Sequence, residues 1–299
     1  MKKRPTSVTL RAGKSGELEL SPTTASEQYD RTYFSEGCGR PYQRDDFWLS
    51  WFAGVADRIV AEIAPASVLD AGCAMGFLVE ALRDRGVEAF GLDVSDYALS
   101  QVREDVRPYC RLGSITEPLP RRYDLIVCIE VLEHLSPREA AAAVANLADH
   151  TDDVIFSSTA DDYKEATHVN VRPPEYWVEL FARHQLYRDV DYDASYTADW
   201  AIRLRRSRDP AARQVANYER LTARLREENR QMRELTVEQR TRIASLDRDL
   251  AQVTRDLTEE RALSQSVRHV LKNRMSKTVF PVSTRRGTVV RWLLSRFSR

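Results

Sequence analysis

The chain has 299 residues, of which 42% are apolar and 30% charged, and its 45 Lys and Arg balance its 45 Asp and Glu. That length fits one ordinary domain with extra material, or two small domains, and it can bury a sizeable core. A net charge of zero argues against a nucleic-acid binder, but residues 261–299 contain ten Lys or Arg and no acid. The other 260 residues hold thirty-five bases and forty-five acids, so an acidic body precedes a basic tail.

The sequence indicates a cytoplasmic protein. No apolar run reaches the roughly 18 residues that span a membrane, and the basic start MKKRPTSVTL lacks the apolar core of a signal peptide. The four cysteines have no CxxC spacing, which argues against a zinc cluster or a redox pair: Cys38, Cys73, Cys110 and Cys128. A reducing compartment is therefore expected.

Residues 1–25 are polar and predict a flexible leader. An amphipathic helix is expected over 46–63, and residues 26–208 alternate β-branched runs with helical patterns, which is typical of a parallel sheet covered by helices. The seven predicted strands are Ser67–Asp70, Ala89–Val94, Tyr109–Leu112, Tyr123–Ile129, Asp153–Ser158, Tyr187–Asp193 and Trp200–Arg206. The helices between them are predicted at Gly76–Arg85, Asp96–Glu104, Pro137–His150 and Pro174–His184.

Residues 211–272 contain no Gly or Pro and predict a coiled coil of about 60 residues, roughly 90 Å long. Apolar residues recur at heptad spacing in two registers separated by a stutter: Tyr218, Leu221, Leu225, Met232 and Leu235, then Ile243, Leu246, Leu250, Val253 and Leu257. The alternative is a single solvated helix, which gains little from leucines on one seam. Self-association is therefore expected, although Gln239 and Arg242 in the seam leave the oligomer number open.

The segment 67–82, SVLDAGCAMGFLVEAL, has the strongest chemical signal. An apolar strand ends in Asp70, and a tight turn with Gly72 and Gly76 leads into an amphipathic helix. Glycines there let the backbone turn sharply and let a ligand approach, at the sheet edge where open parallel sheets bind ligands. The dinucleotide fingerprint G-x-G-x-x-G is incomplete, because Ala74 replaces its middle glycine and a phenylalanine ends it. A nicotinamide cofactor is thus disfavoured.

Polar residues also follow the next three predicted strands. The second strand ends in Asp93, within GLDVS, where an acid can accept both hydroxyls of a ribose. The third leads to Gly113–Ile115, at the place of an adenine edge, and the fourth, YDLIVCIEVLEHL, ends in Glu130 and runs into Glu133–His134. Any one such residue can belong to an ordinary exposed strand end, but polar residues at four successive strand ends indicate one ligand site.

With these motifs, roughly residues 25–206 resemble the class I S-adenosylmethionine-dependent methyltransferases. VLDAGCAMG looks like their first motif, GLDVS like their ribose-binding second motif and YDLIVCIEVLEHL like their fourth. The resemblance implies an α/β fold with a Rossmann-like seven-stranded sheet of order 3-2-1-4-5-7-6, strand 7 antiparallel, here followed by the coiled-coil helix. It also implies S-adenosyl-L-methionine as cofactor, bound by Asp70, Gly72, Cys73, Gly76, Asp93, Val94, Ser114, Ile115 and Glu130.

Two further stretches, YDRTYFSEGCGRPYQRDDFW and SSTADDYKEATHVNVRPPEYWVELFARH, look like a bacterial subgroup associated with polysaccharide gene products. The expected activity is O-methylation of a saccharide or glycolipid in bacterial surface polysaccharide synthesis. Two alternatives stay open: a small-molecule or quinone-type O-methyltransferase, and a non-catalytic scaffold acting through its coiled coil. The layout of methyltransferase, coiled coil and membrane tail resembles bacterial polysaccharide chain-termination systems by analogy only.

Two histidines are candidate catalytic bases, because an imidazole pKa near 6.5 suits base catalysis at neutral pH. His134 follows the fourth strand, and His168 follows the fifth, where this fold builds its acceptor pocket. Asn170 and Arg172 could bind acceptor hydroxyls or phosphate near His168. A purely structural role is the alternative for His134.

No metal site is predicted. Asp161 and Asp162 could join Glu130 or His134 around Mg²⁺, but the spacing does not require it and solvated acids are the favoured interpretation. An aromatic-rich stretch is expected to close over the site, comprising Tyr29, Tyr33, Phe34, Tyr42, Phe47, Trp48, Trp51 and Phe52. Packing of a helix onto the domain is the alternative for several of these rings.

Residues 273–299 predict a basic amphipathic tail. Val289, Val290, Leu293, Leu294 and Phe297 can share one helical face, flanked by Trp292, Arg286, Arg291 and Arg296. Such a helix favours an anionic membrane surface, hence a peripheral position at the inner membrane. Nucleic acid is the less favoured partner, and docking onto a protein is a third possibility.

Overall fold

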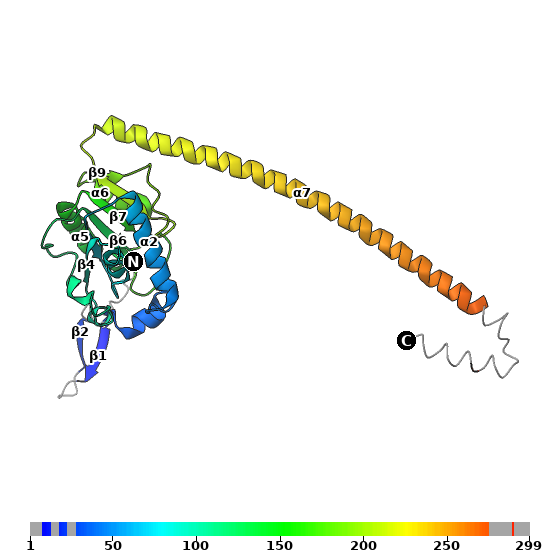
Figure 1. Ribbon diagram of the computed structural model, residues 1–299, viewed down its shortest axis with the longest axis horizontal. Coiled ribbons are helices and arrows are strands. Elements are labelled where there is room, and N and C mark those ends of the chain that lie inside the picture. The colour runs from blue at the N-terminus through cyan, green and yellow to red at the C-terminus, as the bar shows by residue number, and fades with distance from the viewer. Residues whose placement is uncertain (1–7, 13–17, 23–27, 275–288, 290–299) are drawn as a thin grey trace. The chain divides into compact units, whose positions relative to one another are not determined.

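The computed structural model describes residues 8–12, 18–22, 28–274 and 289, in two compact units, Met1–Glu219 and Arg220–Arg299. The elements of the first unit precede one long helix (Figure 1). In chain order they are β1 (Val8–Ala12), β2 (Leu18–Pro22), a π-helical turn (Tyr33–Gly37), α2 (Asp46–Glu62), β3 (Ser67–Ala71), α3 (Phe77–Arg83), β4 (Glu88–Asp93), α4 (Asp96–Ser100), a 3-10 turn (Arg107–Tyr109), β5 (Cys110–Leu112), β6 (Leu125–Ile129), a 3-10 turn (Leu132–His134), α5 (Pro137–His150), β7 (Asp153–Ser157), α6 (Pro174–Ala182), β8 (Leu186–Arg188), β9 (Ile202–Arg206) and α7 (Ala211–Arg274).

Seven strands form one sheet in the order β5-β4-β3-β6-β7-β9-β8. Neighbouring strands from β5 to β7 are parallel, whereas β9 is antiparallel to both β7 and β8. The predicted order 3-2-1-4-5-7-6 with an antiparallel strand 7 is therefore confirmed. The carboxyl ends of β3, β4 and β6 lie side by side at one edge, with the chain order reversing at β3, and such a point is where open α/β sheets bind ligands.

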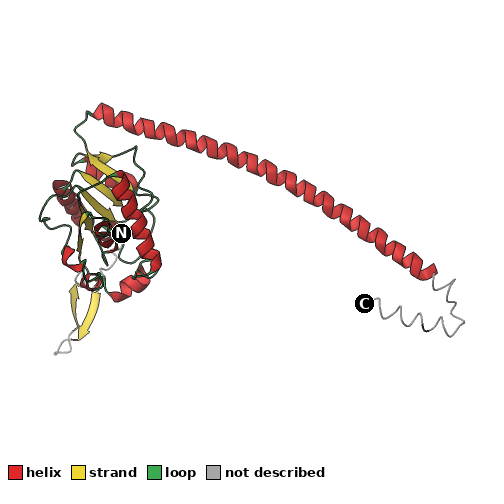
Figure 2. Cartoon of the chain, viewed as in Figure 1, coloured by secondary structure: helices red, strands yellow, loops and turns green. Residues whose placement is uncertain are grey.

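Helices cover both faces of the sheet (Figure 2). Alternate residues of β6 show how: Ile126 and Cys128 belong to the core beneath α5 and α6, whereas Leu125 and Val127 belong to the core beneath α2 and α3. All four side chains are fully buried. A strand that is buried on both faces has apolar residues throughout, which is why LIVCI does not alternate between apolar and polar residues.

Several elements are shorter than predicted. The predicted helix 96–104 ends as α4 at Ser100, where the Arg107 guanidinium donates to the carbonyls of Ser100 and Val102 at 3.0 and 3.1 Å. The predicted strand 187–193 ends as β8 at Arg188, because the Asp189 carboxylate accepts from the Asp191 amide at 3.2 Å and starts a turn. Both boundaries are set by side-chain bonds to the backbone, which a propensity pattern does not encode.

The leader expected to be flexible contains two described strands. β1 and β2 pair antiparallel, from Val8 opposite Pro22 to Ala12 opposite Leu18. They form a separate two-stranded sheet and do not join the seven-stranded one.

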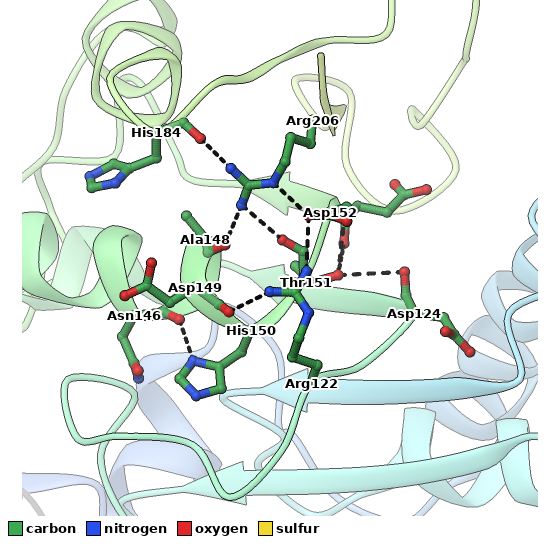
Figure 3. Close-up of polar contacts among 11 residues, drawn as sticks. Arg122, Asp124, Asn146, Ala148, Asp149, His150, Thr151, Asp152, His184 and Arg206 are labelled. Atoms are coloured by element: carbon green, nitrogen blue, oxygen red, sulfur yellow. Dashed lines mark hydrogen bonds and ion pairs between the residues drawn. The ribbon is translucent and has the colours of Figure 1, made fainter. Parts of the chain in front are cut away.

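A cluster of polar contacts, drawn in Figure 3, lies at the sheet edge opposite the carboxyl ends of β3, β4 and β6. Arg206 of β9 donates to the carbonyls of Ala148, Thr151 and His184, and its Nε donates to the Asp152 carboxylate at 2.5 Å. The carbonyls of Ala148 and Thr151 belong to the end of α5, where helices leave such groups unpaired. Arg206 therefore joins β9 to α5 and to the turn after α6.

Arg206→Ala is expected to lower the free energy of unfolding by about 2 kcal/mol, because the carbonyls it serves lose their donor. The control is Arg122→Ala, since Arg122 donates to the Asp149 carbonyl and to Asp152 but its side chain is 54% exposed. A loss below about 1 kcal/mol is expected for that control. Urea unfolding of both variants measures the difference, and equal losses would contradict the assigned role of Arg206.

α7 is a continuous helix of 64 residues. From Leu225 onward the predicted seam residues are exposed along this single helix, with Leu246 at 50% and Leu250 at 66%. Within the part of the chain that is described, no helix is long and apolar enough to cross a bilayer. The predicted basic tail lies outside the described residues, apart from its first two residues and residue 289.

Candidate active site

The turn after β3 is the first component of the site. Gly72 has a φ of +92°, and a Cβ on it would lie 2.3 Å from Cγ2 of Val131. Only glycine fits such a conformation at such a distance. Gly76 has a φ of +70° and caps the start of α3, and Ala74 between them also has a positive φ, of +45°. The loop thereby approaches the ends of the neighbouring strands.

Asp93, the last residue of β4, holds this loop in place. Its Oδ2 accepts from the Ala74 amide at 2.8 Å, and its Oδ1 accepts from the Ser95 amide at 2.8 Å. A carboxylate has about four acceptor positions, and the Val94 amide also acts on Asp93, so at least one position stays available to a ligand. A pair of vicinal hydroxyls, as on a ribose, matches two neighbouring acceptors.

Two adjoining cavities open at this edge of the sheet. The smaller, of about 130 Å³, is lined by Asp93 and by the loop after β5. The larger, of about 430 Å³, is lined by Asp70 and by the loop after β7. The cavities share six lining residues: Tyr33, Phe34, Gly72, Ala74, Glu130 and His134. A ligand in the first can therefore reach a second molecule in the other.

The predicted site residues come together around these cavities with one exception. The smaller cavity is lined by Gly72, Asp93, Val94, Ser114, Ile115, Glu130 and His134, and the larger by Asp70, Gly72, Cys73, Glu130, His134 and His168. Gly76 lines neither: a Cβ there would lie 3.2 Å from Val102, so its role is in the backbone and packing of α3. Cys73 is buried, with its sulfur packed where Gly91 leaves room.

The floor of the larger cavity suits a cation. Asp70 is buried, and burial, followed by the charge of Asp93, raises the pKa of its carboxyl to about 8. Burial also raises the pKa of Asp93, against the lowering effect of its backbone hydrogen bonds. Two neighbouring carboxyl groups out of water disfavour their charged forms. A positively charged ligand group, such as a sulfonium or an ammonium, would relieve that cost.

A chain of hydrogen bonds positions the two histidines. His134 Nδ1 lies 2.8 Å from the Thr167 hydroxyl, and that hydroxyl donates to Glu165. His168 Nδ1 lies 2.9 Å from the Asp162 carbonyl, and the two imidazole rings are 4.7 Å apart. Burial, then the neighbouring His168, lowers the pKa of His134 to about 4.

Aromatic residues before β3 form one wall of both cavities. Tyr29, Tyr33 and Phe34 line the smaller cavity, and the Tyr29 carbonyl accepts from the Ser95 hydroxyl at 2.5 Å. Tyr42, Trp48, Trp51 and Phe52 line the larger cavity. Phe47, which belongs to the same predicted aromatic stretch, is 47% exposed and lines neither.

Sequence reasoning missed three residues that organise the site. Glu165 and Thr167 orient the histidines. The only feature of the sequence that pointed to them was their closeness to His168 in EATHVNV. Trp200 donates from Nε1 to Glu130 Oε1 at 2.9 Å across 70 residues, and no local pattern pointed to that contact.

Burial and the neighbouring Glu130 also raise the pKa of Glu133 well above its usual range.

Residues 42–194, just over half of the chain, match the family model described as a methyltransferase domain. The chain belongs to this family, and with its sheet order it is a class I methyltransferase, the class whose cofactor is S-adenosylmethionine.

Among curated relatives, ubiquinone biosynthesis O-methyltransferase of Nitrosomonas europaea is 32% identical over 112 residues, which is 34% of this chain and 47% of the relative. The protein of that name from Neisseria meningitidis serogroup C is 31% identical over 152 residues, 47% of this chain and 58% of the relative. The chain spans about half the length of the curated relatives it matches.

Two solved structures are similar in fold. N-methyltransferase NodS from Bradyrhizobium japonicum WM9 is 18% identical with a TM-score of 0.47, over 62% of this chain and 99% of that one. Magnesium protoporphyrin IX methyltransferase from Synechocystis PCC 6803 is 17% identical with a TM-score of 0.44, over 53% of this chain and 83% of that one.

Proposed function

We propose that this chain transfers the methyl group of S-adenosylmethionine to an oxygen atom of a saccharide or glycolipid acceptor in bacterial surface polysaccharide synthesis. The observation that carries the proposal is the pair of adjoining cavities, one with the Asp93 carboxylate and the other with two imidazoles. The saccharide acceptor rests on the resemblance of two sequence stretches to a polysaccharide-associated subgroup.

In this proposal the cofactor binds along the shared wall. The Asp93 carboxylate receives the ribose hydroxyls, and Val94, Ser114 and Ile115 border the adenine. The turn with Gly72 and Cys73, together with Asp70 and Glu130, surrounds the methionine part. The buried carboxyl of Asp70 supports this orientation, because it favours a cationic group nearby. Gly76 supports the turn without touching the cofactor.

The larger cavity would hold the acceptor. Methyl transfer from a sulfonium is an in-line displacement, so the acceptor oxygen must lie about 3 Å behind the methyl group with water excluded. We propose His168 and His134 as the catalytic residues on this side. A carbonyl only accepts, so His168 Nδ1 donates to the Asp162 carbonyl. Its Nε2, which lies 3.4 Å from Glu165 Oε2, would act on the acceptor hydroxyl in its unprotonated form.

A quinone-type phenol is the second candidate acceptor. The curated relatives are named ubiquinone biosynthesis O-methyltransferase, and the aromatic wall of the larger cavity also suits a flat ring. A phenol and a sugar hydroxyl require the same chemistry, in which oxygen is methylated and loses its proton.

Transfer of a labelled methyl group tests these acceptors. The intact chain is incubated with methyl-labelled S-adenosylmethionine and either bacterial glycolipid extract or a soluble catechol, and the product is identified by mass spectrometry. Label in a glycolipid hydroxyl is the expected result. Label only in the catechol would support the quinone-type alternative, and transfer to neither would leave the scaffold alternative.

We further propose that α7 forms a coiled coil that holds copies of the chain together. The exposed seam leucines support this, because an isolated helix gains nothing from a continuous apolar seam. Residues 26–208 would then be the catalytic domain and 211–272 the coiled coil. The basic tail at 273–299 stays a sequence-based prediction for an anionic membrane surface.

Leu246→Asp with Leu250→Asp is expected to weaken self-association by at least about 100-fold, because each substitution removes about 2 kcal/mol of apolar burial per chain. Sedimentation equilibrium measures the association constant. The matched control is Arg248→Asp with Gln252→Asp, which adds the same acids off the seam and should leave most association intact. A monomeric parent chain would rule out the coiled coil.

A further inference from the structure

We propose that Glu133, His134 and His168 bind one divalent transition-metal cation beside the acceptor cavity. One ligand atom from each of these residues lies within 4.8 Å of those of the other two. Ligand atoms bonded to one such ion at about 2.1 Å lie about 3–4 Å apart. A side-chain movement of about an ångström would therefore bring the three ligand atoms to metal-binding distances. This inference goes beyond methyl transfer and does not depend on which acceptor is used. With the site occupied, the ion, and not the lone pairs of His134 and His168, would act on the acceptor hydroxyl.

The buried carboxyl group of Glu133 supports a cation site. The residue is fully buried, and neither of its carboxylate oxygens has a hydrogen-bond partner in the described part of the chain. A buried carboxyl group without partners either stays protonated or is compensated by a cation, and two imidazole nitrogens within reach favour a bound metal ion here. His134 and His168 are the neighbouring groups that can complete such a site.

The backbone around Glu133 holds the second ligand segment in place. The Glu133 carbonyl accepts from the amides of Val169 at 3.0 Å and Asn170 at 2.9 Å. These bonds join the loop that carries His168 to the turn that carries Glu133 and His134. The ligand set is thus positioned by main-chain contacts before any ion binds.

The hydrogen bonds of both imidazoles match those of metal ligands. The Thr167 hydroxyl donates to Glu165, so its oxygen accepts from His134 Nδ1, and His168 Nδ1 donates to the Asp162 carbonyl. Metal-binding histidines usually donate their second ring N–H in this way, which fixes the tautomer. Nε2 of each ring is then the nitrogen that would bind an ion, and in the structure His168 Nε2 lies 3.4 Å from Glu165 Oε2.

The donor set selects the class of ion. Two imidazole nitrogens with a carboxylate suit Zn²⁺, Mn²⁺, Fe²⁺ or Co²⁺, whereas Mg²⁺ and Ca²⁺ prefer oxygen ligands throughout. The Mg²⁺ arrangement around Asp161 and Asp162 considered from the sequence is therefore disfavoured. Because His134 and His168 also line the larger cavity, an ion here would lie next to a bound acceptor.

Cobalt titration of the tag-free, chelator-treated full chain tests the site. We expect one Co²⁺ per chain, with visible d–d absorption that Zn²⁺ abolishes and a tenfold excess of Mg²⁺ does not. Glu133→Gln keeps the shape of the side chain but removes its charge and is expected to weaken Co²⁺ binding at least about 100-fold. His168→Ala is expected to do the same. Asp161→Asn, outside the ligand set, should bind Co²⁺ like the parent.

Several outcomes would overturn the site: no cobalt absorption in the parent chain, unchanged Co²⁺ affinity in Glu133→Gln, or equal competition by Mg²⁺. Circular dichroism of each variant verifies folding, and His168→Gln serves where His168→Ala does not fold. S-adenosylmethionine binding is measured on the same samples. Cofactor binding without Co²⁺ binding would refute the metal site alone and leave the proposed methyl transfer standing.

Discussion

Asp93→Ala is expected to weaken S-adenosylmethionine binding at least about 100-fold. In the proposed complex the variant loses the hydrogen bonding of the ribose to a charged acceptor, worth about 1.5–3 kcal/mol per hydrogen bond. It also releases the amides of Ala74 and Ser95, which the carboxylate holds at 2.8 Å in the free protein. Equilibrium dialysis with labelled cofactor measures the dissociation constant.

The matched control for this prediction is Asp96→Ala. Asp96 lies three residues further on, in the first turn of α4, and lines neither cavity. Its removal should change cofactor affinity by less than about threefold. Undiminished affinity in Asp93→Ala would show that the cofactor does not bind through this strand end.

His168→Ala is expected to slow methyl transfer by about 10²–10⁴-fold and to leave S-adenosylmethionine affinity within about twofold. The reason is position: His168 lines the larger cavity only, away from Asp93. A single-turnover assay with saturating labelled cofactor measures the transfer step, and dialysis measures binding on the same sample.

His184→Ala is the control for that loss. The His184 carbonyl accepts from Arg206 (Figure 3), and His184 lines neither cavity. Transfer by His184→Ala should match the parent chain. Full activity in His168→Ala would remove His168 from the acceptor side of the mechanism.

The sheet was predictable because its signals are local. The continuous apolar runs of β3 and β6, buried on both faces, and the glycine turn after β3 are readable in short windows. Short windows do not specify the strand order, which was predicted from the family resemblance that VLDAGCAMG and GLDVS carry. The ends of α4 and β8 were misplaced because Arg107 and Asp189 form the terminating hydrogen bonds, and such contacts need the folded chain.

The candidate site also combines residues that local sequence reveals with contacts that only the folded chain reveals. Asp93 and Gly72 could be found because each follows directly from a strand end or a turn requirement. The contact between His134 and His168 could not, because it depends on the Val169 and Asn170 amides reaching the Glu133 carbonyl. Glu133 was named after the fourth strand but given no role, because its complete burial depends on the folded chain.

Calorimetric titration of the intact chain with S-adenosylmethionine tests the central claim most directly. We expect saturable binding of one cofactor per chain, competed by S-adenosylhomocysteine and lost in Asp93→Ala. Absence of binding heat at several temperatures, with the chain folded, would contradict a catalytic role for this fold and favour a scaffold that works through α7.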